Sequence, residues 1–113
     1  MKNYFKNKKI IITGHTGFKG SWLTFWLYLM GAKVIGISKD IPSKPSLFNT
    51  LKLKKKIKDV RLDIRNLNLL KKIFRKYQPD LVFHLAAQSL VKKSYYHPIE
   101  TFTTNTIGTL NIM

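Results

Sequence analysis

The sequence predicts an α/β fold, a doubly wound parallel sheet with helices on both faces, and three observations predict it. Short apolar runs rich in Ile, Val and Leu recur along the chain and are typical of strands buried in a parallel sheet. Longer segments with helical periodicity separate these runs. The run Ile10–Ile12 leads through Gly14, Gly17 and Gly20 directly into a helical segment. This alternation predicts right-handed crossovers and the strand order 3-2-1-4.

Length and composition indicate a globular chain. Its 113 residues suit one domain or part of a larger one, and a hydrophobic content of 44% is ordinary for a folded protein. The absence of cysteine excludes disulfides and cysteine metal sites, and suits a reducing compartment. We expect no metal site.

The charge is strongly positive, with 21 Lys and Arg against 5 Asp and Glu, a formal net charge of +16. One interpretation is a protein that binds nucleic acid or an acidic surface. The other is compositional drift, because Lys greatly outnumbers Arg while Ile, Asn, Phe and Tyr are plentiful. Readers of nucleic acid favour the forked guanidinium of Arg, and only Arg61, Arg65 and Arg75 are available. We favour drift and expect no specific nucleic-acid partner.

No segment reads as a signal peptide or a membrane span. The basic stretch 1–9 precedes Ile10–Ile12, but the glycines that follow interrupt the apolar run too early for a secretory signal. The longest uncharged stretch, Gly20–Ala32, is shorter than the ~20 residues that a span needs. We expect a cytoplasmic protein without a membrane partner.

The first predicted helix, Phe18–Met30, has apolar residues on nearly every side, which is typical of a helix buried on more than one face. We expect its stripe of Trp22, Trp26 and Met30 to lie in the core, and Gly31 to end the helix.

The remaining elements follow in order. We predict a strand at Val34–Ser38, a loop through Pro42 and Pro45, a short helix at Ser46–Leu53, a strand at Asp59–Ile64, a helix at Asn66–Tyr77, a strand at Asp80–Leu85, a Lys- and Tyr-rich loop, and a helix from Pro98 to Met113. The basic run Lys52–Lys58 reads as a solvated loop. His84 lies within an apolar run, so we expect a hydrogen-bonded core histidine.

The glycine segment after Ile10–Ile12 predicts a phosphate site. A strand, a glycine turn and a helix N-terminus together direct unpaired backbone N–H groups at one point. Gly14 would allow the tight turn, Gly17 the close approach of a pyrophosphate, and Gly20 tight packing of helix on strand. The spacing G-x-x-G-x-x-G is one residue longer in its first gap than the usual dinucleotide fingerprint.

Two further positions bear on a bound dinucleotide. An acidic residue usually ends the second strand and binds the ribose, but this chain has Ser38 there and Asp40 two residues later, so either could reach the ribose. Asp63 could bond the adenine amino group or cap the next helix, and its spacing leaves both open. The small pair Ala86–Ala87 leaves room for a ribose against the backbone.

Several separated motifs carry a family resemblance. They are Thr13–Leu23 (TGHTGFKGSWL), Asp63–Arg65 (DIR), His84–Gln88 (HLAAQ) and Thr104–Thr109 (TNTIGT). On these residues the chain resembles the N-terminal part of the extended short-chain dehydrogenases/reductases that act on nucleotide sugars. Within that family it looks most like the CDP-glucose 4,6-dehydratases, because of the amino-acid sequences of segments 15–20, 45–48, 88–91 and 94–98.

The resemblance implies a Rossmann-type domain that binds NAD. Phe18 and Lys19 would present backbone N–H groups to the pyrophosphate, and Asp63 with Ile64 would hold the adenine. Asn105 matches a residue that supports the active-site water network. The cofactor-binding residues implied in full are Gly14, His15, Thr16, Gly17, Phe18, Lys19, Gly20, Ser38, Asp63, Ile64, Leu85, Ala86, Ala87, Gln88 and Thr104.

The resemblance also implies a reaction, the conversion of CDP-glucose to CDP-4-dehydro-6-deoxyglucose for deoxysugars of lipopolysaccharide, by a homodimeric lyase. That reaction requires a Tyr-x-x-x-Lys pair and a Thr-Asp-Glu acid/base set, which we expect to lie outside this chain. Residues 1–113 would then be the N-terminal part of an NAD-binding domain, without its later strands and substrate domain, and inactive alone. The alternatives are a dTDP-glucose 4,6-dehydratase, a UDP-glucose 4-epimerase, or a non-catalytic basic fragment that binds nucleotides or nucleic acid.

Overall fold

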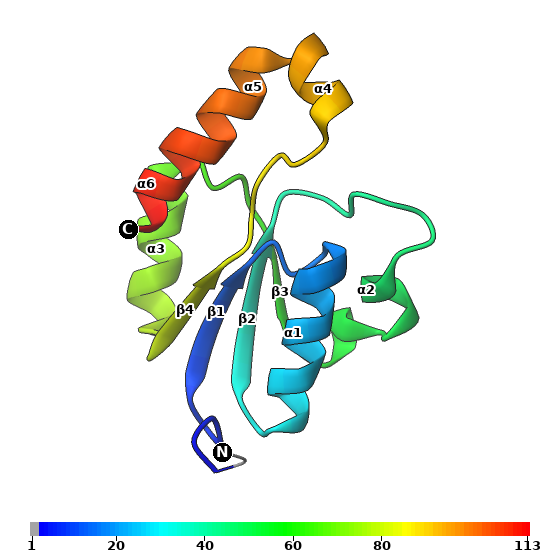
Figure 1. The fold of residues 1–113 in the computed structure, drawn as a ribbon. Helices are drawn as coiled ribbons and strands as arrows, with labels where there is room; N and C mark the ends of the chain where they lie inside the picture. Colours follow the sequence, from blue (N-terminus) through cyan, green and yellow to red (C-terminus); the bar gives the residue numbers. More distant parts are fainter. Residues whose placement is uncertain (1–2) are drawn as a thin grey trace.

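The computed structural model describes residues 3–113 and contains one four-stranded parallel sheet (Figure 1). The sheet order is β3-β2-β1-β4, which confirms the predicted order. Its strands are β1 (Lys9–Thr13), β2 (Lys33–Ser38), β3 (Lys58–Arg61) and β4 (Leu81–His84). Thr13 pairs in register with Ile37 on one side and His84 on the other. The carboxyl ends of the strands therefore meet at one edge of the sheet.

Helices cover both faces and the carboxyl edge of this sheet (Figure 1). One face carries α1 (Phe18–Leu29), with α2 (Leu47–Thr50) and the short 3₁₀ helix η1 (Leu53–Lys55) beside it. The other face carries α3 (Leu67–Tyr77) and α6 (Gly108–Ile112), and α4 (Val91–Tyr96) and α5 (Pro98–Phe102) extend beyond the edge. A π-helical segment η2 (Thr103–Ile107) joins α5 to α6. None of the helices within residues 3–113 is both long and apolar enough to cross a membrane.

The central strand β1 explains why the sheet is buried on both faces. Its three consecutive isoleucines are fully buried, and their side chains alternate between the faces. Ile10 and Ile12 pack with Leu27 of α1, whereas Ile11 packs with Leu70 of α3. Apolar, β-branched residues at every position are therefore what this strand requires.

The prediction for the Trp stripe of α1 was wrong for Trp22 and Trp26, whereas Met30 packs against the core. Trp22 is 50% exposed and Trp26 is 62% exposed, whereas the residues that α1 buries are Gly20, Ser21, Thr24 and Leu27. Small side chains allow the helix axis to lie close to the sheet, which leaves the large aromatic rings on the outer side. An apolar residue on nearly every side of a helix cannot indicate by itself which side faces the sheet.

Three predicted boundaries also differ from the structure. Residues 91–96 form α4, where we expected a loop. Strand β3 ends at Arg61, although the N–H of Leu62 still donates to the Ser38 carbonyl oxygen at 3.0 Å, and the side chains of Leu62 and Ile64 pack in the core with Leu70 of α3. The predicted helix 46–53 divides into α2 and η1, since Lys52 adopts a left-handed conformation with φ of 52°.

We predict that Leu27→Ala lowers the free energy of unfolding by about 2–5 kcal/mol, because it opens a cavity under α1. Trp26→Ala on the outer side of the same helix should cost less than about 1 kcal/mol. Urea denaturation followed by circular dichroism measures both. An equal loss for the two variants would contradict the orientation of α1.

Candidate functional site

The loop between β1 and α1 turns sharply against the exit of β4. Gly14 has a φ of +78°, and its N–H donates to the carbonyl oxygen of Ile37 at 2.8 Å. A Cβ on Gly14 would lie 2.7 Å from the backbone nitrogen of Ala86, and one on Gly20 would lie 2.0 Å from the Gly14 oxygen. Packing inside the protein therefore requires glycine at both positions.

Gly17 differs from these two glycines. A Cβ there would meet only the Gly14 oxygen, at an ordinary 3.5 Å, and the φ of Gly17 is −73°, which any residue can adopt. No contact among the described residues explains glycine at this position. The missing side chain instead leaves open space in front of the N-terminus of α1.

The N-terminus of α1 faces this open space with unpaired donors. Gly17 is the N-cap residue and makes no side-chain cap bond. The backbone N–H groups of Phe18 and Lys19 find no backbone acceptor within residues 3–113. Such donors, together with the helix dipole, favour an anion. This open space and the two free N–H groups, which we call the cradle at Gly17, provide the room and the donors that a pyrophosphate would need.

The His15 ring lies inside the protein. It is fully buried against Gly36, where a Cβ would come within 2.3 Å of the ring. Its Nε2 is 2.7 Å from Oδ1 of Asp59, and its Nδ1 is 3.1 Å from the hydroxyl of Ser38. A carboxylate only accepts, so Nε2 carries the proton and the Ser38 hydroxyl donates to Nδ1. Burial lowers the pKa of His15, although the bond to Asp59 opposes that shift.

This network bears on the ribose position that the sequence left open. The Ser38 hydroxyl donates a hydrogen bond to Nδ1 of His15. Its oxygen also accepts a hydrogen bond from the backbone N–H of Thr16, with 3.4 Å between Oγ and the nitrogen. Its hydrogen-bonding capacity is thereby largely used inside the protein. The backbone of Asp40 is also fixed, because its carbonyl oxygen accepts from the Thr16 hydroxyl at 2.6 Å, while its side chain is exposed.

A second, partly buried set of hydrogen bonds fixes the exit of β4. The Thr13 hydroxyl accepts from the N–H groups of Leu85 and Ala86, both at 3.1 Å, so its own proton goes to Nδ1 of His84 at 2.6 Å. His84 Nε2 then donates to the hydroxyl of Thr109 at 2.9 Å. The predicted hydrogen bonding of His84 is confirmed, but its ring is half-buried and lies outside the core. Burial lowers the pKa of His84. These hydrogen bonds tie β1, β4 and the last helix together beside the glycine loop.

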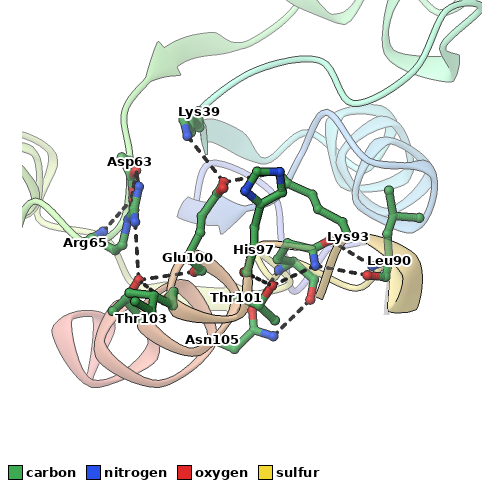
Figure 2. A network of polar contacts seen from close by, with 12 residues as sticks. Lys39, Asp63, Arg65, Leu90, Lys93, His97, Glu100, Thr101, Thr103 and Asn105 are labelled. Carbon is green, nitrogen blue, oxygen red and sulfur yellow. Dashed lines mark hydrogen bonds and ion pairs between the residues drawn. The ribbon is translucent and has the colours of Figure 1, made fainter. Parts of the chain in front are cut away.

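Asp63 follows β3 at the same edge of the sheet. Arg65 donates to its carboxylate from Nη2 at 2.6 Å and from Nε at 3.0 Å (Figure 2). These bonds lower the pKa of Asp63. The capping alternative is wrong, because the side chain of Asn66 caps α3 by accepting from the N–H of Leu69 at 3.1 Å.

Asn105 fixes the segment that follows β4. Its Oδ1 accepts from the N–H of Gln88 at 2.7 Å, and its Nδ2 donates to the Gln88 carbonyl at 2.9 Å. The Gln88 side chain continues to the hydroxyl of Thr101 at 3.0 Å. Thr104 is half-buried in the same π-helical segment. The amide of Asn105 therefore positions the backbone of Gln88.

The structure thus brings the predicted site residues to the carboxyl edge of the sheet, in the loops after β1, β2, β3 and β4 and in η2. It also adds residues that the sequence pattern did not indicate. Asp59 of β3 is hydrogen-bonded to His15, and Thr109 of α6 is hydrogen-bonded to His84. Both contacts join residues far apart in sequence, so spacing could not reveal them.

We expected the catalytic Tyr-x-x-x-Lys pair to lie outside this chain. The spacing Tyr-x-x-x-Lys does occur in this chain, at Tyr4 and Lys8. The Lys8 ammonium lies 5.0 Å from the centroid of the Tyr4 ring. Both residues precede β1, whereas the glycine loop follows it. The pair therefore lies at the opposite end of the strand from the candidate site.

A parallel sheet whose carboxyl ends meet a glycine loop where the strand order reverses defines a Rossmann-type fold. Residues 11–113 match the family model described as GDP-mannose 4,6 dehydratase. The chain belongs to this family. The predicted resemblance of the chain to the extended short-chain dehydrogenases/reductases that act on nucleotide sugars is thereby confirmed.

Three relatives illustrate the similarity. CDP-glucose 4,6-dehydratase of Salmonella typhimurium is 46% identical over 112 residues, which cover 99% of this chain and 31% of that enzyme. UDP-glucose 4-epimerase of Thermotoga maritima, solved with UDP-glucose, has a TM-score of 0.80 at 31% identity, covering 91% of this chain and 32% of that one. The Bordetella bronchiseptica enzyme WbmH, solved with NAD+, has a TM-score of 0.77 at 29% identity, covering 94% and 34%. The chain thus spans about a third of these relatives.

We predict that the His15 ring titrates below the ordinary histidine value of 6.5. Its pKa is depressed in the folded state, so the unfolded chain binds more protons below pH 6.5. The free energy of unfolding that depends on a neutral His15 is therefore fully present above pH 6.5 and is lost as the pH falls through the folded pKa. Proton NMR of the ring measures it, with the urea-unfolded chain as control. A folded titration at or above 6.5 would contradict the buried network.

Proposed function

We propose that this chain binds NAD at the carboxyl edge of its sheet, as the N-terminal part of a nucleotide-sugar 4,6-dehydratase. The observation that carries the proposal is the cradle at Gly17, where open space faces the free backbone donors of Phe18 and Lys19. An NAD+ complex among the structural relatives supports the same cofactor.

Each part of the dinucleotide has residues suited to it. The pyrophosphate would lie on the N–H groups of Phe18 and Lys19, where the helix dipole stabilises its charge. The adenine would lie at Asp63 and Ile64. The ribose and nicotinamide would lie along residues 85–88 and Thr104, and Asn105 holds the backbone of Gln88 in position. When bound, NAD supplies the acceptor for a hydride, and this chain binds and orients it.

For the substrate we propose CDP-glucose, converted to CDP-4-dehydro-6-deoxyglucose. The support is the 46% identity with a CDP-glucose 4,6-dehydratase over nearly the whole chain. The structural similarity to a UDP-glucose 4-epimerase favours a second candidate function, that of an epimerase with the same cofactor-binding part. We propose a homodimer for the whole enzyme.

We also propose that the 113-residue chain alone does not convert CDP-glucose. A dehydratase of this kind needs a tyrosine whose pKa a nearby lysine lowers, within reach of the substrate. The Tyr4–Lys8 pair lies at the far end of β1. Detectable product from the purified chain would contradict this proposal.

We predict that Gly17→Ala weakens NAD binding at least about tenfold without unfolding the chain. The added methyl group meets no close contact inside the protein but fills the space in front of α1. Isothermal titration calorimetry measures the affinity, and circular dichroism reports the fold.

Gly20→Ala is the matched variant in the same loop. Its methyl group would collide with the Gly14 backbone, so we expect a loss of stability as well as of binding. Unchanged NAD affinity in folded Gly17→Ala would contradict a pyrophosphate at this loop. Absence of NAD binding by the wild-type chain would contradict the proposal as a whole.

A further inference from the structure

We propose that Lys39 faces the adenosine ribose of the bound dinucleotide, and that this site accepts the 2′-phosphorylated cofactor NADP as well as NAD. The inference rests on the proposed cofactor site and concerns its selectivity. It follows from the residues at the end of β2, the position where recognition of the ribose 2′-hydroxyl or 2′-phosphate is decided.

The end of β2 lacks the carboxylate that selects NAD. An acidic side chain there bonds the ribose hydroxyl and repels a 2′-phosphate. Here the residue is Ser38, which is buried, and its hydroxyl donates to His15 and accepts from Thr16. Ser38 therefore supplies no negative charge against a phosphate, and the next residue along the chain is a cation.

The Lys39 side chain reaches from the end of β2 toward Glu100 of α5 (Figure 2). Its Nζ is 3.8 Å from Oε1 of Glu100 in α5, and its charge contributes to the low pKa of Asp63 after β3. Lys39 comes from the end of β2, so its side chain crosses the space between these elements. That is the side of the glycine loop on which Asp63 would hold the adenine.

The contact with Glu100 leaves Lys39 available to a phosphate. The Lys39 side chain is 56% exposed, and an exposed ion pair at 3.8 Å is weak. Lys93 also binds the same Glu100 oxygen, at 3.1 Å, so Glu100 keeps a partner when Lys39 moves (Figure 2). A 2′-phosphate carries up to about two negative charges at neutral pH and is the stronger partner for an ammonium.

Asp40 is the competing residue. Its carboxylate is exposed, and its backbone is fixed to the Thr16 hydroxyl. If Asp40 rather than Lys39 faced the ribose, it would bond the 2′-hydroxyl of NAD and exclude NADP. The contact of Lys39 with Glu100 favours Lys39, because it directs the ammonium toward α5, beyond the carboxyl ends of the strands.

Calorimetric titration of the 113-residue chain with NAD and NADP tests the inference. We expect the wild-type chain to bind NADP with an affinity within about tenfold of that for NAD. Lys39→Ala should weaken NADP binding about fivefold to tenfold and change NAD binding less than about twofold.

Lys72→Ala, which removes an exposed lysine of α3, is the control with the same charge change and should alter the affinity for neither cofactor. Adenosine 2′,5′-bisphosphate against AMP should reproduce the difference and locate it at the 2′-position.

Two results would overturn the inference. One is a wild-type preference for NAD greater than about tenfold, with Asp40→Asn restoring NADP binding, which would assign the ribose to Asp40. The other is an equal effect of Lys39→Ala and Lys72→Ala on NADP, which would show only long-range attraction to a basic chain. A chain that binds NAD but not NADP leaves the proposed function intact, whereas one that binds neither contradicts both.

Discussion

The structure depends on a close backbone contact in the first loop. The chain reverses at Gly14, and its carbonyl oxygen then lies where a side chain on Gly20 would have to be. The same turn lies against the backbone of Leu85 and Ala86 at the exit of β4. Without side chains at Gly14 and Gly20, the N-terminus of α1 can lie directly beyond the ends of two neighbouring strands. The open cradle at Gly17 is a consequence of that geometry.

A buried polar network supports this loop from the side of β2. The ring of His15 occupies the space over Gly36 and reaches Asp59 on one side and Ser38 on the other. A neutral imidazole satisfies both partners, so the group remains inside the protein without an unpaired donor. The network also uses the hydroxyl at the end of β2, so in the proposed cofactor site the neighbouring Lys39 and Asp40 would be the residues that face the ribose. His15 would then link the architecture of the loop to the selectivity proposed for the site.

Much of this fold could be predicted from the sequence, because its strands are continuous apolar runs and its glycines have fixed spacing. The strand order followed from the alternation of elements and the handedness of crossovers. The orientation of α1 could not be predicted, since apolar side chains surround that helix and only contact with the sheet selects Leu27 over Trp26. The partners of His15 could not be predicted either, because Asp59 is 44 residues away and belongs to no motif. The bonds between Asn105 and Gln88 could not be predicted for the same reason, because the two residues are 17 apart in sequence and lie in different elements.

The most direct test of a dinucleotide at this edge is the change in backbone amide NMR shifts when NAD is added to the isotopically labelled chain. We predict the largest changes at Phe18 and Lys19, with further changes at Ile64 and in residues 85–88. We expect little change on the outer face of α3 or in the basic run 52–58. Changes confined to that basic run would show nonspecific attraction to positive charge, and would contradict a cofactor bound at the glycine loop.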